Sequence, residues 1–81
     1  MSTLQQQAKA LGDPTRHAIF RYIVDAGDAV DVTELTDHFG FHHNAIRQHL
    51  AKLVDADLVV GSTAPASGRG RPKLIYRVAP S

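Results

Sequence analysis

The sequence of 81 residues contains no cysteine. This absence excludes a disulfide scaffold, thiolate zinc sites, iron–sulfur ligation and a cysteine nucleophile. No run approaches the roughly 18 consecutive apolar residues that a membrane-spanning helix needs. The polar start MSTLQQQ lacks a basic segment followed by an apolar one, as a secretory signal would have. We therefore expect a cytoplasmic protein that does not associate with a membrane.

The sequence also lacks the residue arrangements that carry catalysis or hold a metal. Its serines stand outside any strand–turn–helix elbow, and no glycine-rich phosphate loop follows a strand and opens a helix. Histidine pairs that bind a metal on one helix are three or four residues apart. His43 and His49 are six apart, whereas His38 and His42 lie on opposite sides of Gly40. We expect no enzyme, no catalytic residue, no metal site and no cofactor.

Charge is distributed unevenly along the chain, although the formal net charge is only +1. Acidic side chains outnumber basic ones in residues 1–41, whereas basic side chains outnumber acidic ones in residues 42–81. A basic surface can therefore exist in the second half. An apolar share of 43% with 21% charged residues is typical of a folded chain. The core of so short a chain is small, so we expect a partner to help bury its surface.

Apolar residues at helical spacing predict two helices in the first third of the chain. The first covers residues 4–11 with a narrow apolar stripe and stops at Gly12. The second covers residues 14–26, with Asp13 as a candidate N-cap and Gly27 as its end. The apolar stripe of the first helix is Leu4, Ala8 and Leu11, and the apolar positions of the second are Ala18, Ile19, Tyr22, Ile23 and Ala26.

Two further helices are separated by only a few residues. After a short strand at residues 29–30, Asp31 stands three residues before Glu34, which is the spacing of a capping box. The third helix that begins there stops at Gly40, and a fourth helix is predicted over residues 43–55. Two helices joined so tightly predict a helix-turn-helix. The third helix directs Leu35 and Phe39 inward.

The fourth helix has an apolar side and an unusual polar side, which separate at about 100° per residue. The polar side carries amide and guanidinium groups, which can form paired hydrogen bonds with adenine and guanine in the major groove. Ala51 keeps the middle of this side low, and Lys52 on its flank can reach a phosphate. A polar face that only contacts solvent is the alternative. We expect Ala45, Ile46, His49, Leu50 and Leu53 inside, and Asn44, Arg47, Gln48, Ala51 and Asp55 outside.

The last third of the chain predicts a β-hairpin with a basic tip. The strands DLVVGST and KLIYRV are joined by APASGRGRP, in which Arg69 and Arg71 flank a glycine. Two arginines on a thin extended segment can enter a narrow A·T-rich minor groove, and RGRP is similar to the core of an AT-hook. A flexible tip, or one that touches only phosphates, is the alternative. Alternation in the second strand places Leu74, Tyr76 and Val78 on one face and Lys73, Ile75 and Arg77 on the other.

Nearly the whole chain resembles the winged helix-turn-helix regulators, especially the ArsR-like ones. The resemblance rests on LGDPTRHAIFRYI, VTELTDHFGFHHNAIRQHLAKLVDADLVV and GRGRPKLIYRV. It implies a mainly α fold with a small β-hairpin, in the order helix, helix, short strand, helix, helix, hairpin wing. Family members tend to have a further helix after the wing, whereas this chain ends at VAPS. We expect one winged helix-turn-helix domain over residues 1–81, either alone or as the N-terminal part of a longer regulator.

The resemblance also implies where DNA would be contacted. Residues 43–54 would form the recognition helix in the major groove, and residues 67–73 would form the wing. Family members usually carry Ser or Thr where His42 stands, and His is a poorer cap, so His42 is a candidate for contact with a phosphate instead. The base readers would be His43, Asn44, Arg47 and Gln48. The candidate DNA-binding residues are His42, His43, Asn44, Arg47, Gln48, Lys52, Arg69, Arg71 and Lys73.

We expect a sequence-specific regulator of transcription that binds double-stranded DNA, a repressor rather than an activator. A homodimer with contacts through the first helix would read half-sites about 34–36 Å apart. A winged-helix module that binds other proteins is the first alternative, and a histidine-based metal sensor is the second. Metal-sensing relatives commonly hold cysteines near the third helix, where this chain reads DVTELTD. The sequence identifies no operator and no small-molecule or metal effector.

Overall fold

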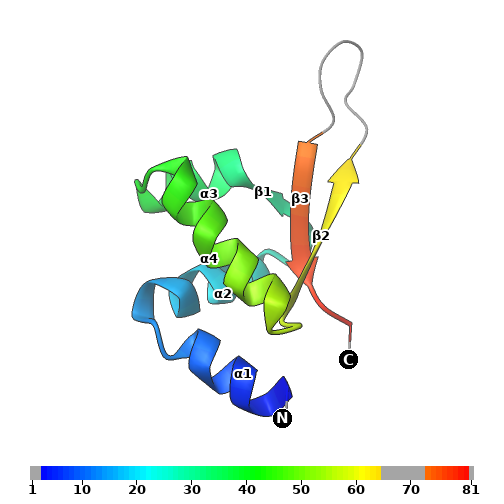
Figure 1. Cartoon of the computed structure of the whole chain (residues 1–81). Helices are drawn as coiled ribbons and strands as arrows, with labels where there is room; N and C mark the ends of the chain where they lie inside the picture. Colours follow the sequence, from blue (N-terminus) through cyan, green and yellow to red (C-terminus); the bar gives the residue numbers. More distant parts are fainter. Residues whose placement is uncertain (1–2, 65–72, 81) are drawn as a thin grey trace.

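The computed structural model describes residues 3–64 and 73–80, so the predicted wing residues Arg69 and Arg71 lie outside the described part. The predicted fold class, mainly α with a small β-hairpin, is confirmed. The elements are α1 (Thr3–Leu11), α2 (Pro14–Ala26), β1 (Val30–Asp31), α3 (Val32–Phe39), α4 (His43–Asp55), β2 (Val59–Ala64) and β3 (Lys73–Val78). Figure 1 shows the helices gathered on one side of the strands β2 and β3.

The helix boundaries follow from local capping chemistry. The Asp13 carboxylate accepts a hydrogen bond from the Arg16 backbone N–H at 3.0 Å and caps α2. The Asp31 carboxylate accepts one from the Glu34 backbone N–H at 2.8 Å and caps α3. Such caps satisfy N–H groups that have no partner within the helix. The helices α2 and α3 end at Gly27 and Gly40, both left-handed with φ of 68° and 74°.

The end of α4 adopts a left-handed conformation without a glycine. Asp57, with φ of 60°, donates its backbone N–H to the Val54 carbonyl at 3.0 Å. The Leu58 N–H donates to the Leu53 carbonyl, also at 3.0 Å. These two bonds form a Schellman motif, whose left-handed position is usually glycine because a Cβ atom is unfavourable there. Asp57 therefore carries backbone strain two residues before β2 begins.

Replacing Asp57 by glycine should raise the free energy of unfolding by about 0.5–1 kcal/mol, since the left-handed backbone costs a glycine little. Urea unfolding followed by circular dichroism measures the change. The matched variant Asp55→Gly introduces glycine at the last helical residue of α4. It should lower the free energy of unfolding by up to about 1 kcal/mol. Equal destabilisation by both variants would show that position 57 is not strained.

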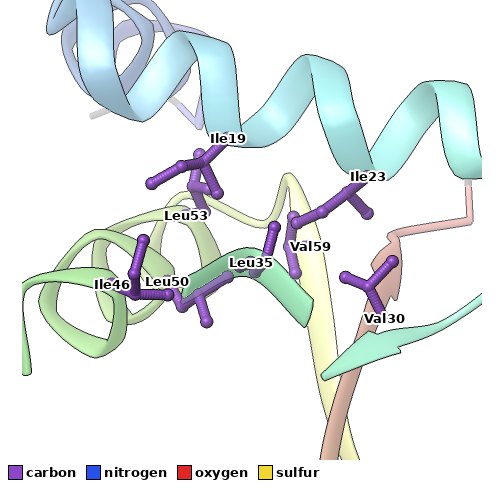
Figure 2. Close-up of a cluster of buried hydrophobic side chains, with 8 residues drawn as sticks. All are labelled: Ile19, Ile23, Val30, Leu35, Ile46, Leu50, Leu53 and Val59. Carbon is purple, nitrogen blue, oxygen red and sulfur yellow. The ribbon is translucent and has the colours of Figure 1, made fainter. Parts of the chain in front are cut away.

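One hydrophobic core connects all the elements that position α4. Figure 2 shows side chains from α2, α3, α4 and the strands converging between α2 and the helix-turn-helix. Every side chain in this cluster is at most 2% exposed. Burial of this kind is the main favourable contribution to folding. The cluster consists of Ile19, Ile23, Val30, Leu35, Ile46, Leu50, Leu53 and Val59.

The strands form one antiparallel sheet in the order β1-β3-β2. Tyr76 in the central strand pairs with Val30 on one side and with Gly61 on the other. A Cβ atom on Gly61 would lie 3.0 Å from Cε2 of Tyr76, so the glycine makes room for the ring. The ring packs against the core. The short strand predicted from the sequence therefore becomes the third strand of the wing sheet.

Burial differs from the predicted pattern in α1 and in the hairpin. In α1, Leu4 is 74% exposed, whereas Ala10 and Leu11 in the last turn pack inward. In β3, Leu74 is 51% exposed although it shares a face with the half-buried Tyr76. The helices cover only part of the hairpin (Figure 1). Apolar spacing thus identified these elements correctly but not how much of each one is covered.

Candidate nucleic-acid interface

The start of α4 is set by a histidine cap. His42 Nδ1 accepts a hydrogen bond from the Asn44 backbone N–H at 3.1 Å, and the His42 carbonyl accepts bonds from the Ala45 and Ile46 N–H groups. The His42 and His43 rings stack with their centroids 4.3 Å apart. The helix begins where the sequence predicted, with His42 acting as its cap.

The outward side of α4 contains the predicted base-reading side chains. Asn44, Arg47 and Gln48 are all exposed, while Ile46 and Leu50 on the inward side are fully buried. Within the described ranges, none of the three outward side chains makes a hydrogen bond or an ion pair. Their donors and acceptors are therefore free to bind a ligand. The predicted division of α4 into two faces is confirmed.

His49 lies at the edge of the core. It is half-buried, as the sequence predicted for a packed histidine, and its Nδ1 atom is buried without a hydrogen-bond partner among the described residues. The pKa of the nearby Asp13 carboxyl is lowered, first by the hydrogen bond from the Arg16 backbone N–H, which favours the ionised form, and to a smaller extent by His49. His49 thus supports the fold and does not belong to the outward face.

Lys73, at the start of β3, is held by the cap of α3. Its Nζ atom donates to Asp31 Oδ2 at 3.1 Å, while Oδ1 of the same carboxylate accepts from the Glu34 backbone N–H. The Asp31 pKa is lowered, first by the bond from the Glu34 N–H and then by Lys73. The predicted capping box is only half formed, because the Glu34 carboxylate does not accept a hydrogen bond from the Asp31 backbone N–H. The Glu34 carboxylate accepts from the Tyr22 hydroxyl at 2.7 Å, which raises the Tyr22 pKa. The Asp31 side chain therefore links the wing to the helix-turn-helix.

This link predicts a contribution to stability that depends on pH. Because folding lowers the Asp31 pKa below its ordinary 3.8, the stabilisation is present above that value. It is lost as the pH falls through the lower pKa of the folded state. Asp31→Asn keeps a good N-cap but removes the charge. It should cost about 0.5–1 kcal/mol at pH 7 through the lost ion pair.

Urea unfolding between pH 2 and pH 7 measures this effect, and the Asp31→Asn curve should be flatter below about pH 4. Asp37→Asn is the matched control on the same helix. Asp37 is exposed and makes no hydrogen bond with any described residue. Its replacement should leave the acid dependence unchanged. An Asp31→Asn protein as sensitive to acid as the wild type would contradict the assignment.

A groove separates α4 from the wing. It has a volume of about 270 Å³ and is lined by the start of α3, by Arg47 of α4 and by the first residues of β3. Arg47 is exposed, and Lys73 contributes a second positive charge that Asp31 partly neutralises. The groove brings together two predicted DNA-binding residues from separate elements. Its lining residues are Asp31, Val32, Thr33, Arg47, Lys73 and Leu74.

A second groove lies on the opposite flank of α4. It has a volume of about 510 Å³ and is lined by α1, by the first turn of α2 and by the C-terminal part of α4. Lys52, predicted to contact a phosphate, lies in this groove. Lys9 and Arg16 also line it, and sequence reasoning assigned neither of them to a site. Because the residues come together only through packing of three helices, no sequence motif marks them.

Two results concern metal binding and membrane spans in the described chain. No group of three or more His, Cys, Asp or Glu side chains in residues 3–64 and 73–80 could hold a metal ion. No helix in these ranges combines the length and apolar character needed to cross a membrane.

The rings of His38 and Phe39 pack near Tyr22, and Phe41 stacks on Phe39 with centroids 6.2 Å apart. This aromatic contact supports the turn that joins α3 to α4.

A tightly joined pair of helices, a β-hairpin behind the second of them and an outward polar face define a winged helix-turn-helix domain. The chain belongs to the helix-turn-helix domain family, whose model matches residues 11–61, and it is similar to ArsR-like regulators. This is a family of helix-turn-helix domains, which agrees with the expectation that the chain is not an enzyme.

Similarity to individual proteins supports the resemblance to ArsR-like regulators. A putative arsenical resistance operon repressor, ArsR2 of Halobacterium salinarum, is 37% identical over 59 residues. The match covers 73% of this chain, which spans half the length of that repressor. A solved structure described as a possible transcriptional regulator for arsenical resistance is 29% identical with a TM-score of 0.72, covering 93% of this chain and 70% of that one.

HlyU from Vibrio cholerae shares the fold. Its structure superposes with a TM-score of 0.76 at 23% identity, covering 98% of this chain and 77% of that one. HlyU from Vibrio vulnificus CMCP6 gives a TM-score of 0.71 at 22% identity, over 95% of this chain and 72% of that one. The predicted winged helix-turn-helix architecture and the ArsR-like resemblance are confirmed.

Proposed function

We propose that this chain is a sequence-specific DNA-binding regulator of transcription, and a repressor, that reads the major groove with α4. The observation that carries the proposal is the outward face of α4, where Asn44, Arg47 and Gln48 are exposed without partners among the described residues. Arg pairs with guanine and Asn or Gln with adenine through two hydrogen bonds each. The helix-turn-helix family membership and the 37% identity to a putative repressor support the same function.

Contacts to the DNA backbone would orient α4 in the groove. Lys52 would bind a phosphate on the flank of α4 that faces α1. Lys73 would bind a phosphate by exchanging or sharing its bond with Asp31. Arg69 and Arg71 of the wing would enter the minor groove or contact phosphates. His42 and His43 would complete the contacts at the start of α4.

We further propose that residues 1–81 form one domain that works in the cytoplasm as a homodimer. The dimer contacts would run through α1, whose Leu4 is 74% exposed. Two domains related by two-fold symmetry would read half-sites about 34–36 Å apart. These assignments are independent of the reading of bases by α4.

A binding titration with mixed duplex DNA at two salt concentrations tests the proposal. Fluorescence anisotropy at about 50 and 200 mM salt should show tight binding that weakens steeply, because bound phosphates release counterions. A module that binds only other proteins would give essentially no binding at either concentration. That result would overturn the proposed function.

A further inference from the structure

The groove between α1 and α4 has the composition of an anion-binding site. We name it the α1 groove and define it by its lining residues. It contains three cationic side chains and one carboxylate, together with the amide of Gln6. Its residues are Gln6, Lys9, Ala10, Arg16, Lys52, Asp55 and Ala56.

None of the three cations of the α1 groove forms an ion pair with a described residue, although the Asp13 carboxylate interacts electrostatically with Arg16. The ion pairs in the described part of the chain are Arg21 with Asp25 and Lys73 with Asp31, so Lys9, Arg16 and Lys52 take part in none. Arg16 Nη1 donates to the Ala10 carbonyl at 3.2 Å, which holds the guanidinium group against the end of α1. Its Nε atom is buried without a partner among the described residues. The groove on the wing side differs, because Asp31 already binds Lys73 there.

The α1 groove lies on the flank of α4 opposite the groove on the wing side. Lys52 follows Arg47 by five residues, so the two side chains point about 140° apart around α4. Arg47 lines the groove on the wing side, and Lys52 lines the α1 groove. Figure 1 shows α4 between the hairpin and α1. A helix about 10–12 Å across fills a major groove about 12 Å wide, so the sugar–phosphate backbones run along both of its flanks.

We propose that the α1 groove binds a phosphate of the DNA backbone through Lys9, Arg16 and Lys52, on the flank of α4 opposite the wing. This inference rests on the proposed function and adds α1 to the DNA interface. Lys9 and Lys52 supply mobile ammonium groups, and Arg16 is fixed by its bond to Ala10. The contact carries no base information, so it contributes equally to all sequences.

The test is the salt dependence of DNA binding by Lys9→Gln, which removes one charge from an exposed position and replaces it with a neutral polar side chain that is one atom shorter. The slope of log affinity against log salt should become smaller in magnitude by about 0.9, as for one lost phosphate contact. The affinity deficit of the variant should therefore shrink about three- to fourfold between about 50 and 200 mM salt. The deficit should be the same for all duplex sequences.

The matched control is Arg21→Gln, which removes one charge from an exposed side chain on α2 outside the α1 groove. It should leave the slope unchanged. Equal changes in the two variants, or no change in Lys9→Gln, would overturn the inference while leaving the proposed function intact. Absence of salt-dependent binding by the wild type would instead overturn the proposed function, and the inference with it.

A titration of the free protein with inorganic phosphate separates a backbone contact from a site for a small anion. Backbone amide signals of Lys9, Arg16 and Lys52 in ¹H–¹⁵N spectra should shift together, and saturating duplex DNA should abolish this response. A phosphate response that persists with DNA bound would show that the groove takes a free anion and would overturn the assignment to the DNA backbone.

Asp55→Asn provides a test that loss of folding cannot imitate. Removing the one carboxylate among the described residues that line the α1 groove should raise affinity severalfold for all duplex sequences, since repulsion of a phosphate there is removed. The control Asp25→Asn, on α2 and outside the groove, should leave affinity unchanged. An unchanged affinity for Asp55→Asn would contradict a phosphate in this groove.

Discussion

Arg47→Ala should weaken binding to the preferred DNA sequence by about 1–3 kcal/mol, or about 5- to 150-fold in the dissociation constant. The loss should be much smaller on duplexes altered at the base pair that Arg47 reads, because its bidentate contact discriminates between bases. Arg47 is exposed and outside the core, so the variant should fold normally. Dissociation constants for the preferred duplex and its single-base variants, compared with the wild type, measure the effect.

Lys52→Ala is the matched comparison on the same helix. Lys52 is exposed on the flank of α4 and is proposed to bind a phosphate, so its loss should weaken all sequences alike. The slope of log affinity against log salt should also become smaller in magnitude by about one. If both variants lost the same amount of selectivity, the division between base reading and backbone contact would be wrong.

Leu50→Ala should lower the free energy of unfolding by about 2–5 kcal/mol. Leu50 is fully buried and projects from α4 into the cluster that joins this helix to α2 and α3 (Figure 2). Its truncation removes apolar contacts and leaves a cavity in a small core, where such a loss is a large fraction of the total stability. Urea unfolding followed by circular dichroism gives the difference.

Leu4→Ala is the matched control for the core variant, since it makes the same chemical change at a side chain that is 74% exposed. Alanine is also a strong helix former, so α1 should tolerate it with a change of less than about 0.5 kcal/mol. Similar losses from Leu4→Ala and Leu50→Ala in the monomer would contradict the assignment of the core.

Most of the fold follows from local signals in the sequence. Helix α2 is marked at both ends, by Asp13 and Gly27, and the structure shows both residues acting as caps. The apolar spacing in α4 separates buried from exposed positions correctly, because one face of the helix packs on a single core. These features depend on residues within one or two helical turns of each other. Sequence reasoning is therefore sufficient for them.

The features that sequence reasoning missed depend on contacts between distant segments. Asp31 and Lys73 are 42 positions apart, and nothing in either local sequence indicates that they bond. The α1 groove requires α1, α2 and α4 to pack together before Lys9 and Lys52 line one site. The large exposure of Leu4 is likewise invisible to periodicity, which identifies an apolar stripe but not what covers it.

His42 shows how local chemistry can replace a missing signal. Ser, Thr, Asp and Asn are the preferred N-caps, so a histidine at this position does not mark the start of a helix in the sequence. In the structure its Nδ1 atom performs the same task by accepting the Asn44 N–H bond. The first turn of α4, which carries Asn44 itself, is thereby held in place by a residue that was expected to contact DNA.

Selection of binding sites from a random duplex library tests the reading of bases by α4 most directly. The wild type should enrich a defined sequence. The triple variant Asn44→Ala, Arg47→Ala, Gln48→Ala should retain salt-sensitive binding through phosphates but enrich no sequence, because all three replaced side chains are exposed on the outward face. Enrichment of the same sequence by both proteins would contradict the account.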